Sequence, residues 1–237
     1  DKNNNNMKLP IVGLVGGLGR RLGNKVKKNP KPLIKINGKP FLEIILTNLI
    51  NKGFKKIILC TGYLESKIFK FVKKKKIKAK IIISSDGKSL LDTGGAIKKA
   101  LNKVSSKFFL MYGDTFLPID FEKIEKKYLK QKKPVLMTIL KNNNKFDKSN
   151  VFFNKKTLLY SKDNYDAKMK YIDYGLLVFN KNVFKTIKKK KFPLSLLLNK
   201  LSLKNLIYGY KVYKRFYEIG SIKGLRETKK YLKSYEY

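Results

Sequence analysis

The feature that most constrains this chain is a glycine-rich turn directly after its first apolar run. The run Leu9–Val15 is predicted to be a buried strand, and it leads into GGLGRRLG, with glycines at positions 16, 17, 19 and 23. A basic NPKP stretch and an Asn-Gly turn follow before Phe41. Glycines let backbone N–H groups approach phosphate oxygens, and basic side chains neutralise the phosphate charge. The segment 11–41 is therefore predicted to hold a polyphosphate.

The spacing of these glycines excludes the two commonest phosphate loops. A Walker loop needs Gly-x-x-x-x-Gly-Lys-Ser/Thr, and the sequence contains no such string. The dinucleotide fingerprint needs Gly-x-Gly-x-x-Gly, but Gly17-x-Gly19 is followed by Leu22 where the third glycine belongs. A turn that only reverses the chain is the alternative. The positions of Arg21 and Lys31 favour the phosphate site.

Length and composition predict one folded domain. A chain of 237 residues with 43% hydrophobic residues can bury a core, and no apolar run approaches the roughly 18 residues of a membrane span. The start, DKNNNNMKLP, lacks the apolar segment of a secretory signal. We expect residues 1–6 to be a polar tail and 7–237 a single domain. One cysteine, Cys60, fits a cytoplasmic protein and a core thiol.

The formal charge of +40 is attributed mainly to genome composition. Only four of the 56 basic residues are Arg, which leaves 52 Lys, and Asn, Ile, Phe and Tyr are abundant too. These are residues of A/T-rich codons, whereas nucleic-acid surfaces use Arg heavily for bidentate contacts and stacking. A nucleic-acid partner is therefore disfavoured, although the field should attract anionic substrates.

Hydrophobic patterning predicts an α/β fold. Strands are expected at Leu9–Val15, Lys56–Thr61, Ala79–Ser84, Lys107–Tyr112 and Pro134–Leu140, and helices at Phe41–Lys52, Tyr63–Lys74, Thr93–Lys103 and Phe121–Lys130. This alternation predicts a Rossmann-like, three-layer α/β/α arrangement with a mostly parallel sheet. After residue 141, strands are expected at Ser149–Phe153, Thr157–Tyr160, Lys170–Phe179 and Leu206–Val212, and helices at Pro193–Leu203 and Ser221–Leu232.

Two linked motifs carry a family resemblance. LVGGLGRRL followed by PKPLIKINGKPFLE resembles the signature of the sugar-1-phosphate nucleotidyltransferases, L-A-G-G-x-G-T-R-L and then P-K-P-L-x-P-V-x-G-K-P. Val15 replaces the usual Ala, and Arg20 replaces the usual Thr. The resemblance implies a nucleotide-diphospho-sugar transferase fold in which residues 7–140 bind the nucleotide and 141–237 cover the sugar. It also implies transfer of a nucleotidyl group from an NTP to a sugar 1-phosphate, with release of pyrophosphate.

The resemblance implies Mg²⁺ as cofactor, held by two carboxylates. Asp114 follows the strand FFLMY as Gly-Asp, at the carboxyl edge where open α/β sheets bind ligands, and it matches the family's metal ligand. Glu218, in FYEIGS, stands where the family has the Asp of a D-x-G motif, and Glu can still supply an oxygen. The alternatives are a turn or cap residue for Asp114 and a cap of the last helix for Glu218.

Phosphate and nucleotide contacts are also implied by the motif match. Arg21 and Lys31 are expected to act catalytically on the triphosphate and on the reacting phosphorus. The base is expected over the backbone of Leu14–Gly17 and near the string SSDGKSLLDTGGAI. The nucleotide-binding candidates are Leu14, Val15, Gly16, Gly17, Gly19, Asp86, Thr93, Gly94 and Gly95. For the TGG segment the alternative is a plain helix start capped by Thr93.

Four residues of the second half are candidates for the sugar phosphate: Asn150, Lys162, Asp173 and Gly175. Lys162 aligns with a family Lys, yet chance placement is a serious alternative among 52 Lys. Asp173 interrupts an otherwise apolar strand, so it needs a partner if buried. A ligand hydroxyl would be one partner, and a backbone amide is the alternative.

The resemblance is greatest to bacterial heptose- and hexose-1-phosphate guanylyltransferases of lipopolysaccharide and polysaccharide pathways. GTP is therefore the favoured nucleotide, with CTP and UTP as alternatives. Two rival functions stay open: a catalytically silent relative that acts as a binding subunit, favoured by Glu218 and Arg20, and a nucleic-acid-associated protein, favoured by the charge. Nothing in the sequence indicates the oligomeric state.

Overall fold

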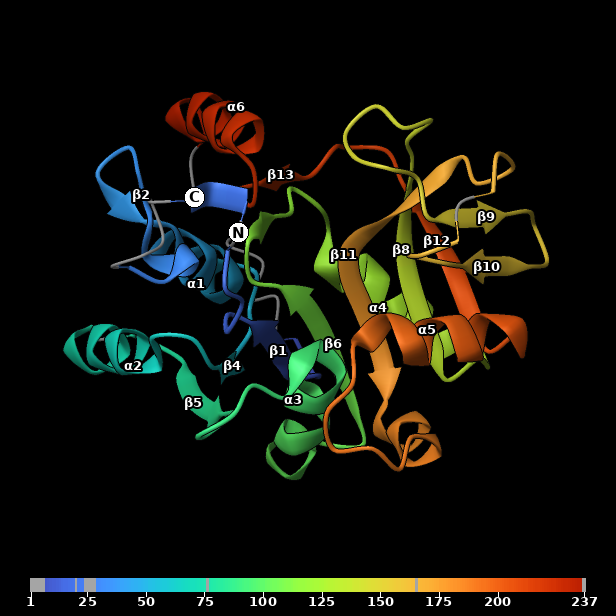
Figure 1. Ribbon diagram of the computed structural model, residues 1–237, viewed down its shortest axis with the longest axis horizontal. Coiled ribbons are helices and arrows are strands. Elements are labelled where there is room, and N and C mark those ends of the chain that lie inside the picture. The colour runs from blue at the N-terminus through green and yellow to red at the C-terminus, as the bar shows by residue number, and fades with distance from the viewer. Residues whose placement is uncertain (1–6, 20, 24–28, 76, 165, 236–237) are drawn as a thin grey trace, which may run out of the picture.

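The computed structural model describes residues 7–19, 21–23, 29–75, 77–164 and 166–235. The expected tail 1–6 and Arg20 lie outside these residues. Within the described chain, nine strands form one sheet, in the order β5-β4-β1-β6-β11-β8-β12, with β9 and β10 joined to one end of β11 (Figure 1). The strands are β1 (Ile11–Leu14), β4 (Lys56–Thr61), β5 (Lys80–Ser85), β6 (Lys107–Tyr112), β8 (Val135–Lys141), β9 (Val151–Phe153), β10 (Leu158–Tyr160), β11 (Tyr171–Asn180) and β12 (Ile207–Val212).

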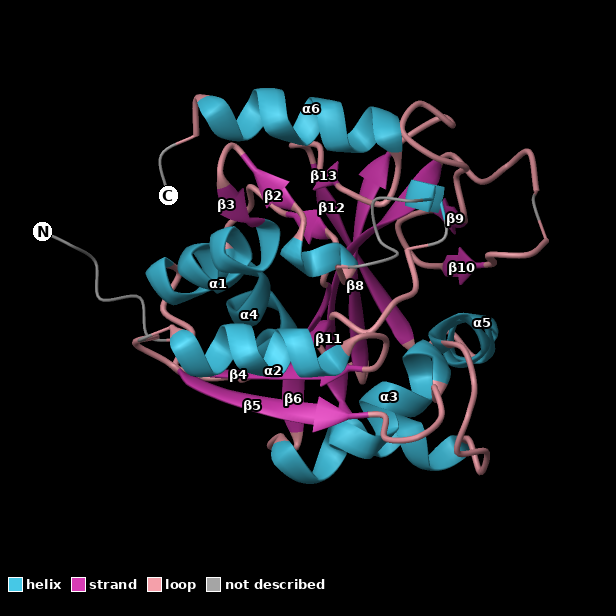
Figure 2. Cartoon of the chain, turned by 60° about the vertical axis from the view of Figure 1, so that its left-hand side comes forward, coloured by secondary structure: helices cyan, strands magenta, loops and turns pink. Residues whose placement is uncertain are grey.

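Helices cover both faces of the sheet, as expected for strands that are buried on both sides. The helices are α1 (Phe41–Asn51), α2 (Glu65–Lys74), α3 (Asp92–Ala100), α4 (Phe121–Lys130), α5 (Leu194–Leu203) and α6 (Ile222–Lys233). Buried residues of α1, α2, α4 and α6 share one apolar cluster with the sheet, whereas those of α3 and α5 share a second. Figure 2 shows α3 and α5 on the side of the sheet away from α1 and α6. The predicted three-layer fold is confirmed.

One antiparallel strand interrupts the parallel sheet and positions the site. The neighbours β5, β4, β1 and β6 are parallel, and β8 and β12 are parallel to each other. Strand β11 lies between β6 and β8, antiparallel to both. Its register shifts between Asp173 and Leu177, around Gly175 at φ 93°. Before this shift β11 pairs with β9, and after it with β6. The divergence of β9 from β6 leaves room for a pocket.

Several short elements were not predicted. Strands β2 (Lys35–Ile36) and β3 (Lys39–Pro40) form a hairpin at the expected Asn-Gly turn, and β7 (Thr115–Phe116) pairs with β13 (Tyr217–Glu218). The short 3-10 helices are η2 (Lys31–Leu33), η3 (Leu101–Lys103) and η4 (Lys181–Thr186). Runs of two or three residues carry too little periodicity to be detected from sequence.

Helices α2 and α3 differ from the predicted bounds by two residues or more. Helix α2 begins at Glu65 rather than Tyr63, because Leu64 adopts a left-handed conformation at φ 53°. Helix α3 begins at Asp92 and ends at Ala100, and η3 continues the turn to Lys103. In the described part of the chain, no helix has the length and apolar character that crossing a membrane requires.

Candidate active site

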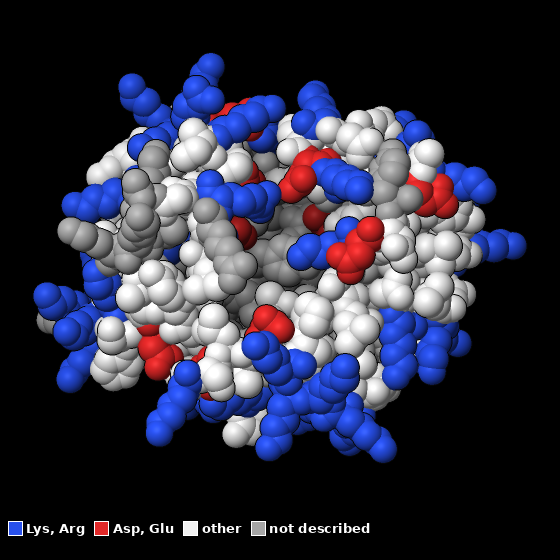
Figure 3. Space-filling model, in the orientation of Figure 1, with Lys and Arg blue, Asp and Glu red and all other residues white. Residues whose placement is uncertain are grey.

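A pocket of about 640 Å³ opens at the carboxyl ends of β1 and β6. Its walls come from the signature turn, the β6–β7 turn, the 142–149 loop, β11, the start of α5 and β13. Seen from the face drawn in Figure 3, Lys and Arg side chains surround the rim, and several Asp and Glu side chains lie around the central hollow. The predicted residues that line the pocket are Leu14, Val15, Gly17, Arg21, Lys31, Thr93, Asp114, Asn150, Lys162, Asp173, Gly175 and Glu218.

An ion pair joins the two halves of the predicted phosphate site. The Lys31 ammonium lies 2.6 Å from Asp114 Oδ2, and the two side chains are 15% and 25% exposed. Asp114 stands in the turn after β6, and this turn approaches β1 closely because residue 113 is Gly. A Cβ at Gly113 would lie 2.3 Å from the carbonyl oxygen of Leu14. The structure therefore brings together the cation and the carboxylate that the sequence placed 83 residues apart.

The carboxylates of Asp114 and Glu218 face the same point beside Gly220. Pairing of β13 with β7, and a 2.9 Å hydrogen bond from the Ile219 amide to the Asp114 carbonyl, fix the two backbones side by side. A Cβ added at Gly220 would lie 2.9 Å from Glu218 Oε2, 3.1 Å from Asp114 Oδ2 and 3.4 Å from Arg21 Nη2. A side chain at position 220 would crowd these three groups.

Glu218 has a second set of contacts at the start of α6. Its Oε1 accepts a hydrogen bond from Ser221 Oγ at 2.5 Å, and its Oε2 accepts from the Ser221 amide at 3.1 Å and from the Gly220 amide. Ser221, not Glu218, is the residue that caps α6, because its Oγ accepts from the Gly224 amide at 2.9 Å. Glu218 thus stabilises residues 220–221 at the start of α6, and its carboxylate also faces Asp114.

Arg21 reaches across the mouth of the pocket. Its Nη1 lies 3.7 Å from Asp147 Oδ2, while Nη2 is the group that faces Gly220. Both side chains of the Arg21–Asp147 pair are more than 60% exposed, so the pair contributes only about 0–1 kcal/mol. A phosphate group can therefore replace Asp147 as the partner of Arg21 at little cost.

The predicted nucleotide contacts divide into residues that line the pocket and residues that do not. Leu14, Val15, Gly17 and Thr93 line it, whereas Gly16, Gly94 and Gly95 do not. Gly16 packs directly against Gly62, since a Cβ added at Gly16 would lie 2.8 Å from the Gly62 amide nitrogen. Thr93 lines the pocket, but it does not cap α3, because its Oγ1 accepts from the Leu194 amide at 2.8 Å instead. Gly94 and Gly95 are buried away from the pocket. Their glycine character is explained by packing: a Cβ on each would lie 2.3 Å from the chain at 190–192.

Asp86 and Gly19 also lie outside the pocket lining. One Asp86 oxygen, Oδ2, accepts from the Leu91 amide at 3.0 Å, and Oδ1 is buried without a hydrogen-bond partner among the described residues. Burial raises the pKa of this carboxyl, despite the hydrogen bond from Leu91. Gly19 adopts a left-handed φ of 63° in the signature turn. Their roles toward the nucleotide stay predictions.

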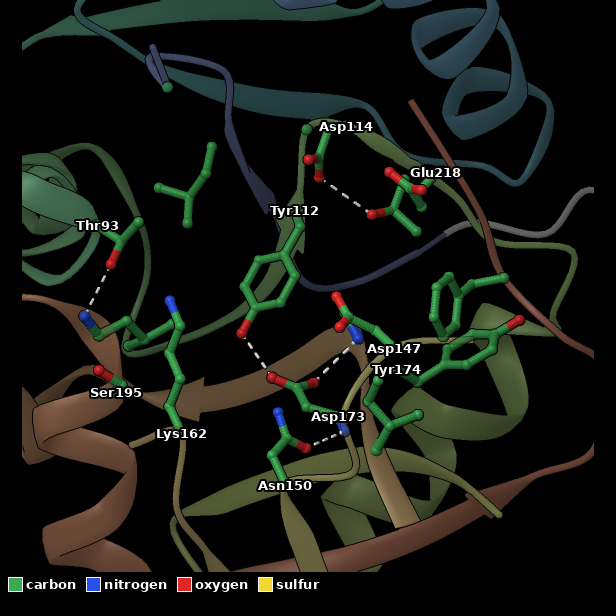
Figure 4. Close-up of a pocket in the computed structure, with 18 of the residues that line it drawn as sticks. Thr93, Tyr112, Asp114, Asp147, Asn150, Lys162, Asp173, Tyr174, Ser195 and Glu218 are labelled. Atoms are coloured by element: carbon green, nitrogen blue, oxygen red, sulfur yellow. Dashed lines mark hydrogen bonds between the residues drawn. The ribbon is translucent and has the colours of Figure 1, made fainter. Parts of the chain in front are cut away.

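The sugar candidates meet on β11 and its neighbours (Figure 4). Asp173 Oδ2 accepts from the Tyr112 hydroxyl at 2.6 Å, Oδ1 accepts from the Gly175 amide at 3.0 Å, and the Asp173 amide donates to Asn150 Oδ1 at 2.9 Å. Burial raises the pKa of Asp173 to about 6. The backbone amide considered as its partner is thus present, together with Tyr112. Lys162 points into the same pocket.

Sequence reasoning missed several pocket residues. Tyr112 precedes the Gly-Asp turn by one residue and could have been found by its position at a strand end. Phe146 and Asp147 come from a loop that composition alone marks as an Asn-Lys tract, and Tyr174 and Phe216 look like ordinary core aromatics. Cys60, in contrast, is the expected core thiol: it is 1% exposed, and burial raises its pKa to about 12.

Fold and site together define an enzyme of phosphoryl-group chemistry: a glycine turn, convergent cations and paired carboxylates at the carboxyl edge of an α/β sheet. Residues 10–230 match the family described as nucleotidyl transferase, and the chain belongs to that family. The expected sugar-1-phosphate nucleotidyltransferase is thereby confirmed.

Two relatives are heptose enzymes. D-glycero-alpha-D-manno-heptose 1-phosphate guanylyltransferase of Campylobacter jejuni is 36% identical over 178 residues, which cover 74% of this chain and 78% of the relative. The enzyme of the same name from Aneurinibacillus thermoaerophilus is 30% identical over 232 residues, 96% of this chain and 100% of the relative.

A solved structure shares the fold. HddC from Yersinia pseudotuberculosis, complexed with GMP-PN, superposes with a TM-score of 0.78 at 23% identity, covering 94% of this chain and 99% of that one.

Proposed function

We propose that this protein transfers a guanylyl group from GTP to a heptose 1-phosphate and so forms a GDP-heptose and pyrophosphate. Two relatives at 36% and 30% identity carry this activity in their names, and the second matches along its whole length. A cytidylyltransferase relative matches over only 27% of this chain, which supports CTP less. The observation that carries the proposal is the convergence of Lys31, Asp114, Glu218 and Arg21 on one corner of the pocket.

The reaction needs charge neutralisation and alignment rather than proton transfer by imidazole. A phosphate oxygen of the sugar 1-phosphate attacks the α-phosphorus of the NTP, a new P–O bond forms, and the bond to the β-phosphate oxygen breaks to release pyrophosphate. Arg21 and Lys31 are placed to neutralise the charge that develops on these oxygens. The chain contains no His, which is consistent with this chemistry.

The donor set of the corner fits Mg²⁺. The carboxylate oxygens of Asp114 and Glu218 face one point, and hard oxygen ligands are those that Mg²⁺ prefers. No group of three or more His, Cys, Asp or Glu suited to a metal occurs in the described ranges, so phosphate and water oxygens would complete the shell. When bound, Mg²⁺ would neutralise phosphate charge and orient the triphosphate. Lys31, which now pairs with Asp114, would then shift to a phosphate oxygen.

The proposed product belongs to the activated sugars from which lipopolysaccharide and other surface polysaccharides are made. This role, and the cytoplasmic location expected from the sequence, rest on the resemblance and on the relatives' activity. A catalytically silent binding subunit is the second candidate, because the Glu218 carboxylate is already engaged by Gly220 and Ser221.

Pyrophosphate release tests the proposal. The full chain is assayed with Mg²⁺ and each of GTP, CTP, UTP, dTTP and ATP against a panel of sugar 1-phosphates that includes D-glycero-α-D-manno-heptose 1-phosphate. Release that requires GTP and the heptose phosphate together is the expected result. Release with another pair of substrates would correct the specificity, and GTP binding without release for any sugar would favour the silent relative.

A further inference from the structure

The loop 142–149, between β8 and β9, is held in one shape by buried polar side chains. Asn142 and Ser149 are 3% and 2% exposed. The Asn142 amide nitrogen donates to Ser149 Oγ at 2.9 Å and to the carbonyl of Asp147 at 2.7 Å, and its Oδ1 accepts from the Phe146 amide at 3.1 Å. These bonds fix the loop tip, residues 146 and 147, in place. Both tip residues line the pocket.

An arginine stack holds the tip from a second direction. The Arg215 guanidinium carbon lies 4.4 Å from the Phe146 ring centroid and 4.6 Å from that of Tyr217, and Arg215 Nη2 lies 2.6 Å from Glu227 Oε2 on α6. Cation–π contacts of this kind stabilise an aromatic ring in a fixed orientation. The loop tip is therefore tied to the last helix as well as to the sheet.

Phe146 belongs to an aromatic wall of the pocket, which consists of Phe146, Phe216 and Tyr174. Ring centroids are 5.9 Å apart for Phe146–Phe216 and 5.8 Å for Phe216–Tyr174, each in an edge-to-face arrangement. All three residues line the pocket. In Figure 4, Tyr174 and Asp147 lie on the side of the pocket away from Thr93 and Ser195.

The chemistry of this wall suits a sugar and not a phosphate. Aromatic rings pack against the apolar C–H faces of a sugar ring, whereas they offer a phosphate no neutralising charge. An ionised carboxylate such as Asp147 only accepts hydrogen bonds, so it attracts hydroxyl donors and repels phosphate. The cations predicted to bind phosphate, Arg21, Lys31 and Lys162, come from other segments of the pocket, and Lys148, next to Asp147, also lines it.

We propose that Phe146 and Asp147 are specificity-determining residues that contact the sugar of the substrate. Phe146, with Tyr174 and Phe216, packs against the carbon face of the sugar, and Asp147 accepts hydrogen bonds from its hydroxyls. Arg21, the partner of Asp147 in the present structure, moves to the phosphates, which releases Asp147 for the sugar. The inference rests on the proposed nucleotidyl transfer to a sugar 1-phosphate, and it specifies how that sugar is recognised.

The test compares two variants with two matched controls. Asp147→Asn keeps the shape of the side chain and removes its charge, and Phe146→Leu removes the ring. Glu122→Gln, on the surface of α4, and Phe69→Leu, at an exposed position of α2, make the same chemical changes away from the pocket. Each protein is assayed by pyrophosphate release, with KM measured separately for GTP and for the heptose 1-phosphate, and with mannose 1-phosphate as the shorter sugar.

We expect a rise of about 10-fold or more in the sugar-phosphate KM for Asp147→Asn, since a hydrogen bond to a charged group is lost. Phe146→Leu should raise the same KM and change the ratio of kcat/KM between the two sugars. The KM for GTP should change less than twofold in both variants, and the controls should match the wild type.

Two results would overturn the inference alone. An Asp147→Asn protein in which only the GTP KM changes would make Asp147 a partner of Arg21 and nothing more. Wild-type sugar KM values in both variants, with an active parent enzyme, would remove the loop tip from sugar recognition while leaving the proposed function intact. A parent enzyme that releases no pyrophosphate with any sugar 1-phosphate would defeat the proposed function and the inference together. Because Asp147 is 63% exposed, its variant is expected to fold normally.

Discussion

At the scale of single residues, Asp114 lies beside two groups that the proposed chemistry requires, the Lys31 cation and the Glu218 carboxylate. We expect Asp114→Asn to lower kcat by about a thousandfold or more, since a neutral Asn amide would hold Mg²⁺ and the Lys31 ammonium less strongly than a carboxylate does. The free energy of unfolding should fall by about 1–3 kcal/mol, because Lys31 and Asp114 are mostly buried and the variant leaves the ammonium without its charged partner. Pyrophosphate release and thermal unfolding give the two readouts, with Glu122→Gln as the control for the lost charge. Wild-type turnover in Asp114→Asn would remove this residue from the reaction.

Arg21 makes a weak contact to Asp147 at 3.7 Å, so we expect its contribution to appear during the reaction rather than in the free enzyme. We expect Arg21→Ala to reduce kcat more than it weakens GTP binding, because the guanidinium acts on charge that develops in the transition state. Steady-state kinetics together with equilibrium binding of GTP separate the two effects. A loss confined to GTP affinity would instead make Arg21 a plain binding contact.

The raised pKa of Asp173 predicts that the stability of the fold depends on pH. Its pKa is raised by burial to about 6, whereas an unfolded Asp titrates near 4. Between these values the folded state keeps a proton that the unfolded state has lost, so the free energy of unfolding falls as the pH rises through this window, by about 1–3 kcal/mol.

The variant Asp173→Asn cannot titrate at this position. Relative to the wild type, its free energy of unfolding should therefore rise between pH 4 and pH 7. Urea unfolding of both proteins at four pH values in this range measures the difference. A constant difference at every pH would show that Asp173 titrates normally in the folded protein.

At the scale of elements, the start of α3 is determined by packing against the segment before α5. The amides of Gly94 and Gly95 donate to the Phe192 carbonyl at 2.9 and 3.1 Å. We expect Gly94→Ala to lower the free energy of unfolding by about 1–3 kcal/mol, although Ala favours helices, because its Cβ would lie 2.9 Å from that same carbonyl oxygen and 2.3 Å from the Phe192 ring.

Gly17→Ala is the matched control, because among the described residues, apart from its two chain neighbours, no atom lies within 4 Å of a Cβ added there. Its denaturant midpoint should equal that of the wild type. Equal midpoints for both variants would mean that the chain at residue 192 moves to accommodate the added Cβ without a measurable loss of stability.

Elements with a clear period were predictable from the sequence, and elements made by long-range contact were not. Strands Lys56–Thr61 and Lys107–Tyr112 and helix Phe121–Lys130 have the predicted bounds, since their apolar patterns end at turn residues or charges. The pair β7–β13 joins segments a hundred residues apart, and its two-residue strands have no pattern of their own. The same holds for the 142–149 loop, whose shape comes from buried Asn142 and Ser149.

At the scale of the whole molecule, the alternation of strands and helices predicted the parallel sheet but not the position of β11. Strand β11, from the second half of the chain, lies between β6 and β8, and its register shift at Gly175 separates β9 from β6. Pairing partners depend on contacts between the two halves of the chain, which hydrophobic periodicity does not encode.

The net charge of +40 makes a prediction that belongs to the molecule as a whole. Lys and Arg side chains surround the pocket face in Figure 3, so the field should raise the rate at which polyanionic substrates arrive. We expect kcat/KM for GTP to fall by about threefold to tenfold between 20 and 200 mM NaCl, with kcat nearly constant. Salt weakens the long-range attraction that brings the substrate to the enzyme more than it weakens contacts inside the pocket. Pyrophosphate release across this range, at fixed free Mg²⁺ and with sucrose as an uncharged control, measures it. A kcat that falls in parallel with kcat/KM would instead place the salt sensitivity in the site itself, at the exposed pair of Arg21 and Asp147.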